Sequence, residues 1–356
     1  MKAKPSESVE IRFETDVKQI RKDLSGVVLA DDGTLWLASD EVRSIERLKR
    51  DDGRFEGHAS FGLEGLLKSP TGKEFDIEGL DLDGGCLWAV GGYGAARQGI
   101  DAKDLKKGDA ATDRAKEIRG LAAVDTKADR RFLARLPISG GKPVAEATRG
   151  GRTLTASRLA STTGDDLLLA ALAGDEHIGP FIRAGVPSKD NGLDVEALAV
   201  VGDRVFVGLR GPVLRGWAVL LEIQVHDAAP GVLGLDPIGA GGRPYLKHFV
   251  FMEGLGFRDI CREGSDFLIL AGPSTLLDGP ARVYRLPNAV DLRENRLHVP
   301  TEVLELPHGR GDDHPEGMTL AGSLTGRPSI LVVYDSPSKD RLPGQHRVLA
   351  DVFKLP

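Results

Sequence analysis

The chain has 356 residues, of which 41% are hydrophobic, and contains 45 glycines and 20 prolines. Its formal net charge of -6 argues against a broad basic face of the kind that binds nucleic acid or an anionic membrane. We therefore expect no nucleic acid and no membrane as partners, while a small anionic molecule held by local arginines, or a protein partner, stays open. The N-terminus lacks an apolar signal segment and no run reaches transmembrane length, which predicts a cytoplasmic protein.

A strand, turn, strand pattern recurs about every 50 to 60 residues along the chain. The turns are rich in glycine and aspartate, residues that suit tight connections between antiparallel strands. Both cysteines, Cys86 and Cys261, lie inside apolar runs, which predicts small unpaired side chains rather than a disulfide. We expect six inner hairpins, at residues 26–39, 78–91, 153–173, 196–209, 257–271 and 316–334.

Two further strands follow most hairpins, and four strands per unit are typical of a β-propeller blade. The expected fold is therefore an all-β, single propeller domain over residues 1–356. Six blades fit the length best, five or seven remain open, and a two-sheet sandwich is the alternative. The last unit, ending with strand 348–354, lacks a fourth strand. Residues 9–14 could supply it, which would close the ring and remove its open edges.

One polar segment, residues 95–120, interrupts the strand pattern. It has the composition of a solvated loop or short helix. Its position between the second and third strands of the second unit places it on the face where inner strands begin, so it could also act as a lid over the channel mouth.

Glutamates recur at the start of the inner strands. Aligned on their apolar runs, the hairpins begin with Ser25, Glu78, Ser157 or Arg158, Glu196, Arg258 and Glu316. In a six-unit ring the glutamates alternate and face one axis, where three carboxylates would repel one another unless a cation lay between them. Oxygen ligands indicate Ca²⁺ first, with Mg²⁺ or Mn²⁺ as alternatives. In the other interpretation, each glutamate accepts backbone N–H groups of the neighbouring unit and has a purely structural role.

Other polar side chains should reach the same face. Arg210 and Arg258 are suited to bind a carboxylate or phosphate, or alternatively to pair with the glutamates; Tyr93 and Asp335 are further candidate ligand-binding residues. Nucleophile and nucleotide-binding motifs are missing, so an enzyme of this kind would use metal-activated water with Glu196 as base. That predicts a metal-dependent hydrolase of phosphate or carboxylic esters. The alternative is a non-enzymatic scaffold or ligand sensor. Asp40, Asp76, Asp194 and His314 are expected on this face as well.

The run KDNGLDVEALA at residues 189–199, with GLRGPVLRG at 208–216, resembles a bacterial family known as a domain of unknown function. FRDI at 257–260 and PEG at 315–317 support the resemblance. More distantly, the repeated acid-x-Glu-Gly-Leu element is similar to one in propellers of phytase-like esterases and calcium-binding lactonases. This second resemblance implies metal-ligand roles for Glu78, Glu196 and Glu316, although the arginines of this chain depart from an all-acidic funnel.

Overall fold

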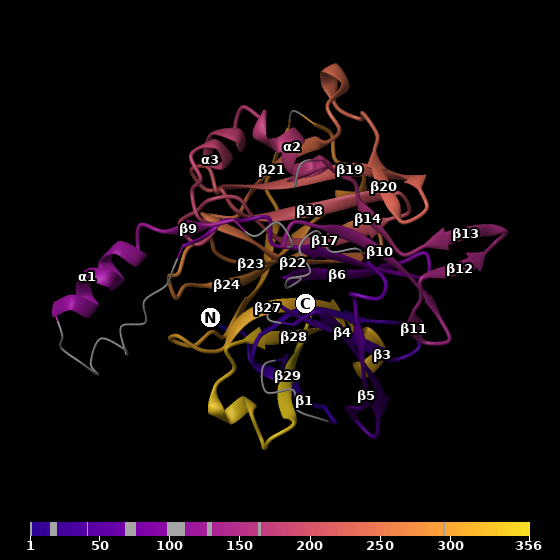
Figure 1. Cartoon of the computed structure of the whole chain (residues 1–356). Coiled ribbons are helices and arrows are strands. Elements are labelled where there is room, and N and C mark those ends of the chain that lie inside the picture. The colour runs from indigo at the N-terminus through magenta and orange to yellow at the C-terminus, as the bar shows by residue number, and fades with distance from the viewer. Residues whose placement is uncertain are drawn as a thin grey trace.

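The computed structural model describes residues 2–14, 20–40, 42–67, 76–97, 111–126, 130–162, 165–294 and 296–356. Antiparallel strands form five four-stranded units around one axis, and the first strand of each unit lies nearest that axis (Figure 1). A propeller fold is therefore confirmed. The ring has five units rather than the six that fitted the length best, and five was one of the alternatives that the sequence left open.

The units follow the chain in order. The first unit consists of β2 (Leu24–Leu29), β3 (Thr34–Ser39), β4 (Ser44–Asp51) and β5 (Arg54–Gly62). The second consists of β6 (Ile77–Asp83), β7 (Cys86–Gly91), β10 (Leu133–Ser139) and β14 (Ser157–Leu159). The third consists of β17 (Asp194–Val201), β18 (Arg204–Gly211), β19 (Trp217–Ala229) and β21 (Leu246–Phe251). The fourth consists of β22 (Leu255–Glu263), β23 (Asp266–Pro273), β24 (Ala281–Leu286) and β26 (Thr301–Leu306). The fifth consists of β27 (His314–Leu320), β28 (Ser329–Asp335), β29 (Arg347–Lys354) and β1 (Glu7–Arg12).

The core of the protein lies between the units. The first strands contact one another in the order β2, β6, β17, β22, β27 and back to β2. Each pair of consecutive units encloses a separate hydrophobic cluster. Trp88 of the second unit, for example, packs in one cluster with Leu198 of the third. Because each cluster is shared by two units, every unit depends on both neighbours for its buried surface. The two cysteines are free, as predicted.

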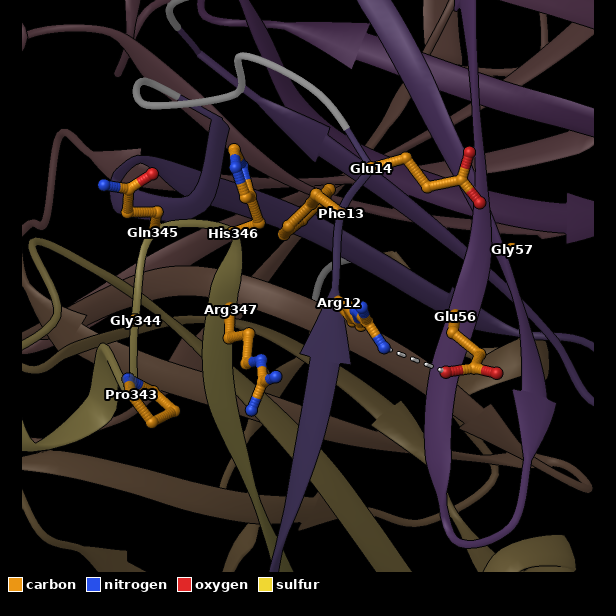
Figure 2. Close-up of a pocket in the computed structure, with 10 residues that line it drawn as sticks. All are labelled: Arg12, Phe13, Glu14, Glu56, Gly57, Pro343, Gly344, Gln345, His346 and Arg347. Atoms are coloured by element: carbon orange, nitrogen blue, oxygen red, sulfur yellow. Dashed lines mark ion pairs between the residues drawn. The ribbon is translucent and has the colours of Figure 1, made fainter.

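The ring closes through the N-terminal strand, as predicted. Strand β1 pairs antiparallel with β29 along its whole length, from Glu7 opposite Val352 to Arg12 opposite Arg347. A parallel bridge between Ile11 and Phe55 links β1 to the first unit. Figure 2 shows this seam between the first and fifth units, where a cavity of about 830 Å³ includes the Arg12–Glu56 ion pair.

The predicted third hairpin, residues 153–173, is wrong. Strand β14 pairs with β10 as the outer strand of the second unit, and Leu167–Ala173 forms helix α2. Its sequence, LLLAALA, contains only leucine and alanine, two of the strongest helix formers. The Asp166 side chain caps the helix by accepting the N–H of Leu169. An apolar run alone did not distinguish a strand from a buried helix.

The remaining elements connect or flank the five units. Helix α1 (Ala111–Gly120) projects from the body of the molecule (Figure 1); residues 98–110 of the predicted lid segment lie outside the described residues. No helix in the described part of the chain is both long and apolar enough to cross a membrane. The other helices are α3 (Gly179–Arg183), α4 (Gly322–Thr325) and the 3-10 turns η1 (Ile20–Lys22), η4 (Ala240–Gly242), η5 (Ala289–Asp291) and η6 (Lys339–Arg341). The short strands are β8 (Ala96–Arg97), β9 (Val124–Asp125), β11 (Lys142–Pro143), β12 (Glu146–Arg149), β13 (Arg152–Thr155), β15 (Ser161–Thr162), β16 (Asp165–Asp166), β20 (Val232–Leu235) and β25 (Leu297–His298).

Candidate functional site

A β-bulge occurs at the same place in each of the five first strands. The register of each strand against its second strand skips one residue, always near the start of the strand. A bulge adds one unpaired residue and re-aims its side chain. The five skipped residues are Ser25, Glu78, Glu196, Arg258 and Glu316.

These bulged residues are five of the positions that the sequence alignment predicted. The backbone is tightly packed beside them, because a Cβ at Gly79 would lie 2.9 Å from the carbonyl oxygen of Glu196 in the next unit. The glycine after Glu78 therefore permits close contact between neighbouring first strands. With five units, the three glutamates fall on the second, third and fifth, so the expected threefold alternation is not found.

A cavity of about 510 Å³, here called the axial cavity, opens where the first strands begin. All three predicted glutamates line it, together with Arg210 and Asp335. Among the described lining residues, carboxylates outnumber basic side chains two to one. The charged members of the lining are Asp40, Asp76, Glu78, Asp190, Asp194, Glu196, Glu316, Asp335, Arg97, Arg130, Lys189 and Arg210.

Two of the three glutamates are bridged by an arginine. Arg258 Nη1 lies 3.0 Å from Glu196 Oε2 and 2.6 Å from Glu316 Oε1. Arg210 Nη1 donates to Glu196 Oε1 at 2.8 Å. The guanidinium groups therefore neutralise Glu196 and Glu316 directly, which is the pairing that the sequence left open as an alternative for both arginines.

In the sequence-based alternative, the glutamates accept backbone N–H groups of the neighbouring unit. In the structure, other side chains have this role. Asp81 Oδ2 of the second unit accepts the N–H of Val200 in the third unit at 2.6 Å. Asp259 Oδ2 of the fourth unit accepts the N–H of Met318 in the fifth at 2.7 Å. These two aspartates lie deeper along their first strands than the bulged residues, and they hydrogen-bond consecutive units together.

On the other side of the axial cavity, Asp40, Asp76 and Glu78 form what we call the acidic cluster. Each residue offers one carboxylate oxygen, and these oxygens lie within 4.8 Å of one another. Asp40 follows β3 of the first unit, whereas Asp76 precedes β6 and Glu78 is its bulged residue. The cluster thus forms at the interface of two units. The sequence predicted Asp40 and Asp76 on this face of the ring but gave them no role as ligands.

Burial and mutual repulsion disfavour the ionised acidic cluster. Burial, followed by the charges of Glu316 and Asp76, raises the pKa of Asp40 to about 9. Burial and the nearby carboxylates of Asp76 and Asp40 also raise the pKa of Glu78 well above its ordinary value. A cation placed among these carboxylates would offset both effects.

The acidic cluster fits a hard divalent cation on two grounds. Its donors are all carboxylate oxygens, which Ca²⁺, Mg²⁺ and Mn²⁺ prefer. In addition, Asp40 Oδ1 is fully buried and has no hydrogen-bond partner among the described residues, which is a costly arrangement for a carboxylate oxygen. Asp76 also has a counter-charge nearby, because Arg130 Nε lies 3.3 Å from its Oδ2.

The two remaining candidate residues lie in different places. Asp335 lines the axial cavity and pairs with His314, whose Nδ1 lies 3.7 Å from Asp335 Oδ2. Tyr93 is buried in the hydrophobic cluster between the second and third units, where its hydroxyl donates to Asp166, the cap of helix α2. Asp335 is thus at the site, whereas Tyr93 contributes to packing.

Comparison with known proteins gives a family and distant structural similarity. A family model described as "Protein of unknown function (DUF3616)" matches residues 23–351, which confirms the predicted membership of a family of unknown function. No curated protein sequence matches the chain.

Among solved structures, the PQQ-bound aldose sugar dehydrogenase from Streptomyces coelicolor is 14% identical, with a TM-score of 0.39 over 98% of this chain and 99% of that chain. A streptogramin B lyase is 9% identical, with a TM-score of 0.37 over 98% of both chains. Virginiamycin B lyase from Staphylococcus aureus is 10% identical, with a TM-score of 0.34 over 98% of this chain and 99% of that chain. Because the family model spans nearly the whole chain, the protein belongs to the family of proteins of unknown function designated DUF3616.

Proposed function

We propose that the protein binds one divalent cation, Ca²⁺ in first place, through Asp40, Asp76 and Glu78 in the axial cavity. Two observations support this site: three carboxylate oxygens lie within 4.8 Å of one another, and Asp40 Oδ1 is buried without a hydrogen-bond partner in the described part of the chain. The ligand set predicted from the sequence, Glu78 with Glu196 and Glu316, is less favoured because arginines already neutralise the latter two. Glu78 belongs to both sets.

The charge of the cavity determines which ligand can follow the cation. Because carboxylates outnumber basic side chains in the lining, an anion alone would be repelled. Arg210 and Arg258 also donate to Glu196 and to backbone carbonyls, so few of their donors remain for a ligand. A small anionic ligand would therefore enter only with the bound cation, which offers it a positive partner.

This arrangement is compatible with ester hydrolysis. A bound cation polarises a carbonyl or phosphoryl oxygen and lowers the pKa of bound water. Glu196 remains the proposed base, and it is held in place by hydrogen bonds from two arginines. We therefore propose a metal-dependent hydrolase of phosphate or carboxylic esters as the enzymatic version of this function.

A second candidate function, a non-enzymatic scaffold or ligand sensor, is favoured by the arginine-bridged glutamates. Arg258 lies on the fourth unit and links the two neighbouring units, the third through Glu196 and the fifth through Glu316. Such a bridge serves to fix the units in place and needs no substrate. The two functions differ in whether a cation binds and whether an ester is turned over.

Calorimetric titration with Ca²⁺ and Mn²⁺ tests the cation site. We expect one cation per chain. The free energy of unfolding should rise by about 2.7 kcal/mol when the free cation concentration is about a hundred times the Kd. Asp76→Asn and Glu78→Gln should each abolish both effects, whereas Asp291→Asn, whose side chain is 81% exposed, should leave them intact. Equal binding by all four proteins would exclude the acidic cluster.

Turnover of a panel of aryl, lactone and phosphate esters tests the hydrolase. Activity should require the cation and should fall at least a hundredfold in Glu196→Gln, since general-base catalysis contributes about 10² to 10⁴. Cation binding without any turnover would favour the ligand sensor. Turnover that survives Glu196→Gln would remove Glu196 from the role of base.

A further inference from the structure

Exposed apolar side chains gather around the mouth of the axial cavity. Seven large hydrophobic side chains are well exposed in the described part of the chain, and single exposed ones are ordinary. Three of the seven, Leu121, Leu276 and Leu277, line the axial cavity or the cavity beside it. Leu276 and Leu277 are the most exposed of all, at 75% and 74%. Such a concentration at a charged cavity indicates an apolar ligand group.

The cavity beside the axial cavity, here called the second cavity, has a volume of about 250 Å³. The two cavities adjoin, because their linings share Lys189, Arg210, Leu276, Glu316 and Asp335. The second cavity is less acidic than the axial cavity: in its described lining Lys189, Arg210 and Arg258 equal in number the carboxylates of Asp278, Glu316 and Asp335. A ligand that reaches both cavities would therefore pass from an acidic region over leucine to one of balanced charge.

The segment that carries the leucines, residues 274–280, is here called the leucine loop. The arginines that neutralise Glu196 and Glu316 also hold this loop in place, through hydrogen bonds to backbone carbonyls. Arg210 Nε donates to the carbonyl of Pro273 at 3.2 Å and its Nη2 to the carbonyl of Thr275 at 3.4 Å. Arg258 Nη2 also donates to Pro273, at 3.2 Å. The leucine loop thus has a fixed base, and its Leu276 lines the same axial cavity as the proposed cation ligands.

We propose that the ligand of this site is a carboxylate or carboxylic ester with an unbranched apolar chain. Its carboxyl oxygen binds the cation of the acidic cluster, and its chain lies over Leu276 and Leu277 toward the second cavity. Lys189, at the junction of the two cavities, adds a positive charge near the head group. This assignment of the ligand rests on the proposed cation site, whereas the apolar contact rests on the leucine loop alone.

Chain-length dependence of binding tests the inference. The full chain, with and without saturating Ca²⁺, is titrated with hexanoate, acetate and hexylamine. With Ca²⁺ present, hexanoate should bind at least about tenfold more tightly than acetate, because four additional methylenes become partly buried. Hexylamine has the same number of carbon atoms but an opposite head charge, and it should not compete with hexanoate for the site.

Leu277→Ser isolates the apolar contact. Leu277 lines the second cavity and is mostly exposed, so this change should leave stability and Ca²⁺ binding unchanged while it weakens hexanoate about threefold or more. Leu297→Ser, at a leucine that is 65% exposed elsewhere, is the matched control and should have no effect on either acid.

The possible outcomes separate the two proposals. Equal binding of hexanoate and acetate, or equal effects of Leu277→Ser and Leu297→Ser, would overturn the inference even if Ca²⁺ binds. Hexanoate binding that depends on Leu277 but is the same with a chelator would overturn the role of the cation in binding the carboxylate and support the apolar contact. Dependence on both Ca²⁺ and Leu277 would support both.

Discussion

Arg258 is the residue on which the charge balance of the axis depends. It is one of the five bulged residues, and its side chain is largely buried between two glutamates from other units. A buried carboxylate whose counter-ion is removed carries a large desolvation penalty. Arg258 therefore allows two acidic side chains to occupy the interior of the ring without a metal ion.

Arg258→Met tests this role. The substitution keeps an unbranched apolar stem but leaves Glu316 without its guanidinium partner and Glu196 with Arg210 alone. We expect the free energy of unfolding to fall by about 3–5 kcal/mol, measured by urea denaturation. Arg262→Met, on the same strand but 42% exposed, should cost less than 1 kcal/mol. Similar losses for the two variants would contradict the structural role of Arg258.

At the scale of elements, the segment between helices α2 and α3 is attached to the third unit by one buried polar group. Lys247 Nζ on β21 donates to both oxygens of Asp175, at 2.9 and 2.7 Å. Tyr245 donates its hydroxyl to Asp175 Oδ2 at 2.6 Å. The Asp175 carboxylate also accepts the N–H groups of His177 and Ile178. This aspartate thus joins the helical insertion to a strand of the ring.

Asp175→Asn should destabilise the protein, and the effect should depend on pH. Burial alone would raise the pKa of Asp175, but the hydrogen bonds from Lys247 and Tyr245 hold it at about 2, below the ordinary 3.8. The contribution of this carboxylate is therefore complete above pH 3.8 and is lost as the pH falls toward 2. At pH 7 we expect a loss of about 3–5 kcal/mol, because Lys247 stays buried without its counter-charge.

Urea denaturation between pH 7 and pH 2 checks this prediction. The difference in stability between the natural protein and Asp175→Asn should narrow below pH 4. Asp291→Asn serves as the exposed control, with no difference expected at pH 7. A difference that stays constant down to pH 2 would show that the carboxylate is not held ionised by its neighbours.

For the whole molecule, the closure of the ring determines stability. The five hydrophobic clusters each need two units, and β1 completes the fifth unit beside the first. Without β1, the edge of β29 would be open, and the hydrophobic cluster between the fifth and first units would lose Val9 and Ile11. An open strand edge is also a template for association between chains.

Removal of residues 2–12 should therefore lower the melting temperature by at least about 10 °C and produce oligomers. An exposed edge favours intermolecular strand pairing, and the lost burial of two large aliphatic side chains weakens the fold by several kcal/mol. Calorimetry and size-exclusion chromatography measure the two effects. Removal of residues 2–5 keeps β1 intact and is the control. A monomer with an unchanged melting temperature would contradict closure by β1.

Much of the fold and the positions of the site residues were determined by the sequence itself. Alternating apolar strands separated by glycine and aspartate turns specify local hairpins, and their recurrence predicts a propeller closed by an N-terminal strand. The same alignment located Glu78, Glu196, Arg258 and Glu316, because a bulge occupies the same place in each repeat. The prediction failed at residues 167–173, where an apolar run indicated a buried strand although leucine and alanine favour a helix.

The tertiary structure alone decided which charges meet. The number of units makes β6 and β17 neighbours, which places Glu78 and Glu196 on adjacent first strands. The direction of each side chain then decides that Arg258 contacts Glu196 and Glu316 while Glu78 faces Asp40 and Asp76. Asp40 follows the second strand of one unit and Asp76 precedes the first strand of the next. Their separation in the sequence does not predict that the two side chains lie close together. Electrostatic interactions depend on distance through space, and sequence separation fixes that distance only within a single hairpin.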